Sequence, residues 1–145
     1  MPYRGGLPAV QDLVAEQLDI TISDTISSVP QIRAGTIKAY AITSDKRIEA
    51  LPDVPTADEA GLPGFHVSTW NALFAPGGTR KPIIDKLNAA AVIALADPAV
   101  RTRFNNLGQD IPPRAQQTPE ALAALVKADI EKWWPIITAA GIKVQ

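Results

Sequence analysis

Hydrophobic and polar positions in the first part of the chain follow two alternating periods. Residues 10–18 place apolar side chains at helical spacing, whereas residues 19–23 (Asp-Ile-Thr-Ile-Ser) alternate apolar and polar positions as a short strand does. A helical segment is then predicted over residues 27–34, closed by Gly35, and a further strand over residues 36–43. This repeated alternation of strand, loop and helix predicts an α/β fold with a parallel-rich sheet and flanking helices.

The remainder of the chain is predicted to be mostly helical. Residues 81–96 have an amphipathic pattern with Thr79 in the N-cap position, and a shorter helix is predicted to end at Gly108. The last helix opens at Thr118, its N-cap, and is expected to run to Gly141. Its buried stripe is predicted to consist of Leu122, Leu125, Val126, Ile130, Trp133 and Ile137.

A predicted strand separates these two differently built halves. Residues 67–79 begin with side chains that favour extended structure and end in Pro-Gly-Gly-Thr, so we interpret them as a crossover between two lobes. The expected organisation is a partial second lobe over residues 1–66, the crossover over residues 67–79, and a helical return to an incomplete first lobe over residues 80–145. Residues 109–112 are a candidate edge strand.

Composition narrows the possible functions. The chain has 145 residues, a formal net charge of -1 and no cysteine, which excludes disulfides, thiolate metal sites and a cysteine nucleophile. His66 is the only histidine, and the scattered basic residues form no cluster of the kind that nucleic acids require. No apolar run approaches the about 20 residues that span a bilayer, and the first residues lack the pattern of a signal peptide. We therefore expect no metal, no cofactor and no nucleic-acid partner.

Candidate chemistry lies where the predicted strands end. Three loops follow such ends, at residues 3–6, 23–28 and 43–47, and helix N-termini there would present backbone N–H groups to an anion such as a carboxylate. Each loop alone has a plainer interpretation, in which glycines make a tight turn and serines cap a helix. The three loops together favour a binding site.

Four side chains need individual interpretation. Asp24 and Asp45 are the carboxylates best placed for acid–base chemistry, although capping the next helix is the more ordinary role for Asp24. Trp70 is a candidate for packing against a ligand or a lobe interface, with core packing as the alternative. His66 is expected to face solvent at the start of the crossover.

Several motifs resemble those of one protein family. Tyr-Arg-Gly-Gly-Leu-Pro-Ala (3–9), Ile-Arg-Ala-Gly (32–35) and Ala-Ile-Thr-Ser-Asp-Lys-Arg (41–47) occur in order, followed by Leu-Pro-Asp-Val-Pro-Thr-Ala-Asp-Glu-Ala-Gly-Leu-Pro-Gly (51–64) and Trp-Asn-Ala-Leu-Phe-Ala-Pro-Gly-Gly-Thr (70–79). Nearly the whole chain resembles the C-terminal half of the tripartite tricarboxylate transporter substrate-binding proteins, the TctC or Bug family. The resemblance implies half of a two-lobed periplasmic binding protein of the Venus-flytrap type. Such a protein captures a small mono- or dicarboxylate for a membrane permease and is no enzyme.

The resemblance also implies which residues meet the ligand. The second-lobe ligand loops correspond to Tyr3, Arg4, Gly5 and Gly6 and to Asp24, Thr25 and Ser27, with Thr43 and Ser44 near the hinge and Trp70 close to the ligand. Backbone N–H groups, hydroxyls and bridging waters would hold the carboxylate. No catalytic residue and no metal ligand is expected.

Because the resemblance covers half of such a protein, two alternatives stay open. A truncated chain could be an oligomeric interaction module that binds no ligand, with copies covering exposed sheet edges. An enzyme acting on a carboxylate through Asp24 or Asp45 is less favoured. The full-length family is periplasmic, whereas this chain is expected to carry no signal peptide.

Overall fold

The computed structural model describes residues 3–142, which divide into two compact units. Unit 1 comprises the described residues up to Asn71 together with Pro98–Ile111, and unit 2 comprises Ala72–Asp97 and the described residues from Pro112 onwards. The boundary after Asn71 falls inside the predicted crossover. Assignment of the units to the lobes of a binding protein stays a prediction, and expectations about residues 1–2 lie outside the described part.

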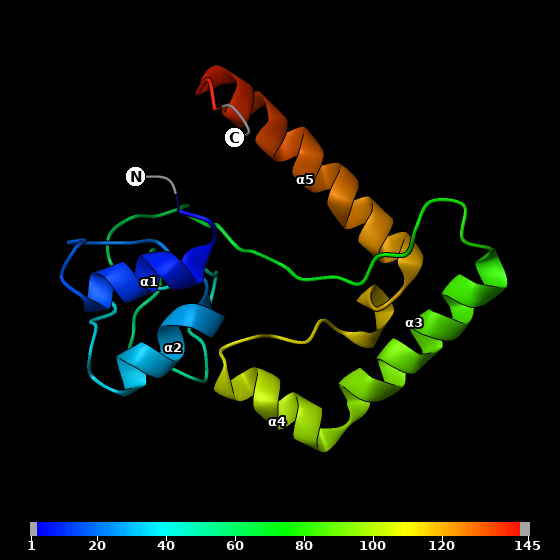
Figure 1. The fold of residues 1–145 in the computed structure, drawn as a ribbon, viewed down its shortest axis with the longest axis horizontal. Helices are drawn as coiled ribbons and strands as arrows, with labels where there is room; N and C mark the ends of the chain where they lie inside the picture. Colours follow the sequence, from blue (N-terminus) through cyan, green and yellow to red (C-terminus); the bar gives the residue numbers. More distant parts are fainter. Residues whose placement is uncertain (1–2, 143–145) are drawn as a thin grey trace. The chain divides into compact units, whose positions relative to one another are not determined.

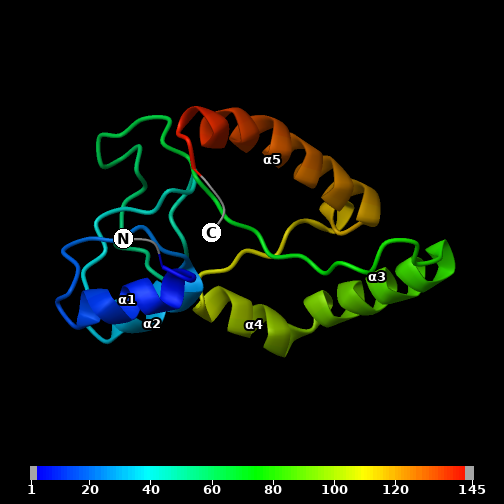
Figure 2. The same cartoon turned by 45° about the horizontal axis from the view of Figure 1, so that its top comes forward.

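Unit 1 contains three helices around a small core. These are α1 (Gly6–Val14), α2 (Thr25–Arg33) and α4 (Pro98–Asn106). Helices α1 and α2 lie side by side in both views (Figures 1 and 2). The core consists of the buried Val29, Ala50 and Leu51, against which the half-buried Ile32, Ile42, Ile48 and Val54 pack.

Glycines stand at one end of α1 and of α2, and the one after α2 was predicted. Gly5 precedes α1 with a φ of 106°, a conformation that glycine adopts readily and other residues rarely do. Gly35 follows α2 with a φ of 73°, and the N–H of Thr36 donates to the carbonyl of Gln31, as in a Schellman motif. Glycine therefore ends α2 as predicted, although α2 begins two residues earlier than expected, at Thr25.

The predicted parallel-rich sheet is not present within residues 3–142. The segments 19–23 and 36–43 contain no assigned strand, and neither do residues 67–79 or 109–112. The described part contains one isolated bridge, a parallel one between Ile42 and Thr56. Local sequence favours an extended backbone, but a strand forms only when a neighbouring segment accepts and donates its hydrogen bonds.

Unit 2 contains α3 (Lys81–Ala96), the short 3₁₀ helix η1 (Arg114–Gln116) and α5 (Pro119–Ala139). Thr118 caps α5 as predicted, because its hydroxyl oxygen accepts the N–H of Ala121 at 3.1 Å. The predicted cap of α3 is wrong. Arg80 holds the N-cap position, while the hydroxyl of Thr79 donates to the carbonyl of Pro76 at 2.8 Å.

The apolar faces of the helices in unit 2 are exposed or only partly buried. None of its described residues is buried, and the predicted buried stripe of α5 is wrong because Leu125, Ile130 and Ile137 are 41%, 58% and 38% exposed. Helical spacing predicts that a face is apolar, but burial also needs an element that packs on it. No helix in the described part is both long enough and apolar enough to cross a membrane.

Candidate functional site

Two helix N-termini meet within unit 1. Gly6 is the first residue of α1, and a Cβ added there would overlap Oδ2 of Asp24 and lie 2.8 Å from Oγ of Ser23. Oγ of Ser27, in the first turn of α2, is the next nearest atom at 3.4 Å. The fold therefore brings together two of the loops predicted separately from the sequence, and only a glycine fits where they touch.

Asp24 is engaged in capping α2, as its plainer interpretation predicted. Its Oδ1 accepts the backbone N–H of Ser27 at 2.8 Å, and its Oδ2 accepts the Ser27 hydroxyl at 3.2 Å. The hydroxyl of Ser28 donates to the Asp24 carbonyl at 2.7 Å. A carboxylate at this position also interacts favourably with the helix dipole. These contacts orient Asp24 towards its own helix and give it a structural role.

Several donors at this junction make no hydrogen bond within the described part of the chain. They are the first backbone N–H groups of each helix, at Gly6, Leu7, Thr25 and Ile26, and the hydroxyl of Ser23. The first N–H groups of any helix have no intrahelical acceptor. The Ser23 oxygen is also buried, and a buried polar group without a partner costs about 1–3 kcal/mol. N–H groups at helix N-termini together with a hydroxyl suit a carboxylate.

A contact with the end of α4 holds the start of α2 in place. The hydroxyl of Thr25 donates to the carbonyl of Gly108 at 3.1 Å and accepts a hydrogen bond from Nε2 of Gln109 at 2.5 Å. Gly108 packs so closely that a Cβ there would lie 3.0 Å from Cδ1 of Ile48. Sequence reasoning missed Gly108 and Gln109 as site residues, because these contacts span more than 80 positions and leave no local pattern.

Tyr3 and Arg4 flank the junction on its N-terminal side. The Tyr3 hydroxyl donates to Oδ2 of Asp12 at 2.7 Å, and this hydrogen bond raises the pKa of Tyr3 above its ordinary value of 10.0. The contact ties the first loop to the body of α1. Arg4 is exposed. A contact of either side chain with a ligand stays a prediction.

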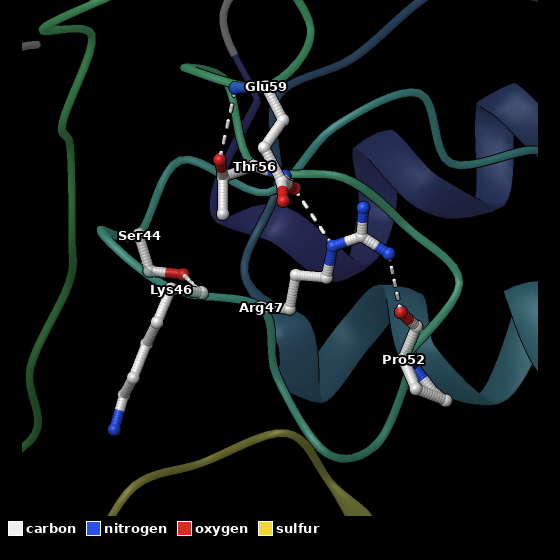
Figure 3. Close-up of polar contacts among 6 residues, drawn as sticks. All are labelled: Ser44, Lys46, Arg47, Pro52, Thr56 and Glu59. Atoms are coloured by element: carbon white, nitrogen blue, oxygen red, sulfur yellow. Dashed lines mark hydrogen bonds and ion pairs between the residues drawn. The ribbon is translucent and has the colours of Figure 1, made fainter.

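The predicted hinge residues are not joined by any hydrogen bond to this junction among the described residues. The hydroxyl of Thr43 donates to the carbonyl of Val67 at 2.6 Å, and the N–H of Val67 returns a bond to the Thr43 carbonyl at 3.1 Å. Thr43 thus fixes the start of the predicted crossover. The Ser44 hydroxyl donates to the Lys46 carbonyl at 2.7 Å within its own loop (Figure 3). Trp70 is 37% exposed, and its approach to a ligand stays a prediction.

A polar network anchors the loop that carries Ser44 (Figure 3). Oε2 of Glu59 accepts Nε–H of Arg47 and the backbone N–H of Thr56, each at 2.8 Å, while the Thr56 hydroxyl oxygen accepts the N–H of Glu59 at 3.2 Å. The reciprocal Thr56–Glu59 pair is a capping box. The guanidinium of Arg47 also donates to the carbonyl of Pro52 at 3.0 Å. The hydrogen bonds from Arg47 and Thr56 hold the pKa of Glu59 below its ordinary value.

Convergent helix N-termini and hydrogen-bond donors without partners are features that suit the binding of a small anionic solute. Among residues 3–142, no group of histidine, cysteine and acidic side chains could hold a metal ion. The model of the tripartite tricarboxylate transporter family receptor (TctC) matches residues 1–142, and the chain belongs to this family. Its members are binding receptors, so the chain is no enzyme.

Solved structures with the same fold are binding proteins. MatC from Rhodopseudomonas palustris, solved with bound malate, is 46% identical, with a TM-score of 0.88 over 94% of this chain and 47% of that chain. The periplasmic binding protein BugD is 41% identical, with a TM-score of 0.89 over 100% and 48% of the two chains. A second R. palustris protein, solved with adipate, is 30% identical, with a TM-score of 0.86 over 98% and 46%. The chain also spans less than half the length of two curated relatives, from Agrobacterium vitis and a Pseudomonas strain, at 41% and 40%; both are 43% identical to it.

Proposed function

We propose that this chain supplies one side of the carboxylate site of a periplasmic solute-binding protein that serves a tripartite tricarboxylate-type transporter. The observation that carries the proposal is the packing of Gly6 on Ser23 and Asp24, which joins two helix N-termini and a buried hydroxyl without a partner. Proteins of the same fold and family bind malate and adipate, both dicarboxylates. Malate-like and adipate-like dicarboxylates are therefore the first ligands to test.

Each group at the junction has a distinct role in this proposal. A ligand carboxylate accepts hydrogen bonds from the N–H groups of Gly6, Thr25 and Ile26, and from the hydroxyl of Ser23 either directly or through a water. Arg4 adds a positive charge that attracts the anion over longer distance. Asp24 stays a helix cap and keeps the first turn of α2 in position.

The proposal also implies partners for this chain, namely the rest of the binding protein and the permease subunits. Small-molecule sites are concave and cover most of the ligand surface, and two-lobed binding proteins achieve this by closing around it. The relatives contain about as many residues again as this chain matches. We propose that this further part covers the other face of the ligand, and that permease subunits receive it from the closed protein.

Binding is tested by calorimetry and thermal shift with malate, adipate and a panel of mono- and tricarboxylates. Ligand at about a hundred times its dissociation constant stabilises the folded state by about 2.7 kcal/mol, which is readily seen as a higher Tm. We expect saturable binding without turnover. A folded chain that binds none of these carboxylates would contradict the proposal that its junction is a site.

Two variants with one matched control locate the site. Gly6→Ala places a Cβ on Asp24 and should abolish binding, whereas Gly77→Ala, which meets no atom within 4 Å, should bind as the wild type does. Ser23→Ala removes a hydroxyl that has no partner, so the fold should keep its stability while affinity falls about tenfold. Unchanged affinity in both Gly6→Ala and Ser23→Ala would place the ligand elsewhere.

A further inference from the structure

Four hydroxyl groups belong to the first turn of α2 and the loop before it, and three of them donate within the protein. The hydroxyls of Ser27 and Ser28 both donate to Asp24, at 3.2 Å to its carboxylate and at 2.7 Å to its carbonyl. The Thr25 hydroxyl donates to a backbone carbonyl at the end of α4 at 3.1 Å. The fourth hydroxyl, that of Ser23, makes no hydrogen bond within the described part of the chain.

The Thr25 hydroxyl is therefore not available to a carboxylate. A hydroxyl group carries one proton and donates one hydrogen bond, although it can also accept, whereas an ionised carboxylate only accepts. The Thr25 hydroxyl already donates to Gly108 and accepts from Nε2 of Gln109 at 2.5 Å. What Thr25 offers a ligand is its backbone N–H, and its side chain holds the end of the helix.

The end of α4 fixes the position of Gln109. Gly108 has a φ of 68°, and its N–H donates to the carbonyl of Asn105 at 2.9 Å. The N–H of Gln109 donates to the carbonyl of Phe104 at 3.0 Å. These two bonds form a Schellman motif, in which the chain turns sharply after the last helical residues. The motif brings the Gly108 carbonyl and the Gln109 side-chain amide to the same hydroxyl, that of Thr25.

Close packing supports this contact. A Cβ added to Gly108 would lie 3.2 Å from Cβ of Thr25 and 3.4 Å from Cγ2 of Val29, both in α2. Val29 is 1% exposed and belongs to the core of unit 1. Thr25 carries both the hydroxyl that the end of α4 holds and one of the backbone N–H groups without an acceptor in the described residues. A change at Gln109 therefore acts directly on a donor of the proposed site.

We propose that Gln109 is a positioning residue for the carboxylate site, because by holding the Thr25 hydroxyl it orients the first N–H groups of α2 towards the ligand. This inference rests on the proposed function and adds a residue to that same site. Donors that are oriented in advance bind more tightly, since less ordering has to accompany binding. Ser23 is then the hydroxyl among the four whose proton no group in the described part of the chain accepts.

Calorimetry with malate and adipate measures the effect of Gln109→Ala on affinity. We expect binding about tenfold weaker than that of the wild type. Gln117→Ala is the matched control, because it removes a hydrogen bond of the same kind in unit 2, from Nε2 to the carbonyl of Pro112 at 2.7 Å. The control should bind as the wild type does.

Two variants of Thr25 separate positioning from a general loss of stability. Thr25→Ser keeps the hydroxyl and should retain the affinity of the wild type, whereas Thr25→Val keeps the shape without the hydroxyl and should weaken binding as Gln109→Ala does. The double variant Gln109→Ala/Thr25→Val should bind no more weakly than either single variant, because both changes remove the same contact. All affinities are measured well below each Tm, so that unfolding does not contribute.

A measurement without ligand keeps this inference separable from the proposed function. The NMR order parameters of the Thr25 and Ile26 amides should fall in Gln109→Ala and stay unchanged in Gln117→Ala. A wild type that binds no carboxylate would overturn the proposed function, and the order parameters would then decide whether Gln109 positions the helix end. A wild type that binds, together with full affinity of Gln109→Ala, would overturn the inference alone. Unchanged order parameters, or additive losses in the double variant, would also overturn it.

Discussion

Arg47 and Glu59 are joined at 2.8 Å between Nε and Oε2, and the same carboxylate oxygen accepts the backbone N–H of Thr56. One acidic side chain thus connects the loop after the second predicted strand to a capped turn twelve residues later. Both members of the ion pair are about half exposed, so their mutual attraction alone contributes little to stability. Most of the stability that this turn gains from its side chains is expected from the capping box, which satisfies two backbone N–H donors.

Thr56→Ala should therefore lower the free energy of unfolding by about 1 kcal/mol, the usual cost of losing an N-cap hydroxyl. Thr56 is 5% exposed, and its hydroxyl oxygen accepts the N–H of Glu59, which would lose its partner. Urea unfolding monitored by circular dichroism measures the change. Thr56→Ser keeps the hydroxyl and should retain most of the stability; a Ser variant as unstable as the Ala variant would contradict the capping role.

Acid should destabilise unit 1 through the same turn. The pKa of Glu59 lies below its ordinary 4.5 because Arg47 and Thr56 donate to it, and that of Asp58 lies below 3.8 because His66 and Gly64 donate to it. The unfolded chain then binds more protons than the folded one, so stability present above about pH 4.5 is lost as pH falls through the lowered pKa values. The measurement is the free energy of unfolding from neutral pH down to pH 3.8 and below.

Glu59→Gln separates this effect from general acid sensitivity. The variant should show a shallower decline of stability in acid than the wild type. Glu16→Gln is the control, because the Glu16 carboxylate makes no hydrogen bond in the described part of the chain. If all three proteins lose stability with the same slope, the network around Glu59 does not govern acid unfolding.

Gly108→Ala should be more destabilising than Gly35→Ala. Both glycines have a left-handed φ, 68° and 73°, so the backbone strain of an added Cβ is similar. A Cβ on Gly108 meets Ile48 at 3.0 Å and Thr25 at 3.2 Å, whereas one on Gly35 meets nothing within 4 Å. Overpacking costs about 1–3 kcal/mol, which is the expected difference between the two variants in urea unfolding. Equal losses would show that the end of α4 does not pack on α2.

Asp24→Asn should keep both the fold and any carboxylate binding, because the amide oxygen still accepts the N–H of Ser27. Asp24→Ala should lose about 1 kcal/mol of stability through the missing cap. The removal of a negative charge beside the proposed site should make binding by Asp24→Asn equal to or tighter than that of the wild type. Weaker binding by this variant in calorimetry would show that Asp24 contacts the ligand itself.

The sequence predicted the features that depend on residues close together in the sequence. Gly35 and Thr118 set helix ends through their own backbone or hydroxyl groups, and the structure confirms both. The range of α3, Lys81–Ala96, was likewise predicted in full. The prediction for Thr79 failed although it also rests on nearby residues. The Thr79 hydroxyl donates to the carbonyl of Pro76 in the preceding turn and so does not cap α3.

Features that depend on distant residues could not be predicted. The strands at residues 19–23 and 36–43 need neighbours in space, and within the described residues the backbone pairing with such neighbours is limited to Ile42 and Thr43 at the end of the second segment. The contact of Thr25 with Gln109 spans 84 positions and has no signature in either segment. The proximity of Gly6 to Asp24 was expected only because loops at strand ends tend to gather at one edge, which is a rule of topology rather than of these residues.

Unit 1 is built from two separate stretches of polypeptide, and this determines which products limited proteolysis should give. Helix α3 lies between those stretches in sequence and contains no buried residue, so a protease should cut there early. The bonds of Thr25 to Gly108 and Gln109, with that of Arg33 to Asn106, would still hold the stretches together. The nicked protein should therefore run as two bands on a denaturing gel and as a single particle under native conditions.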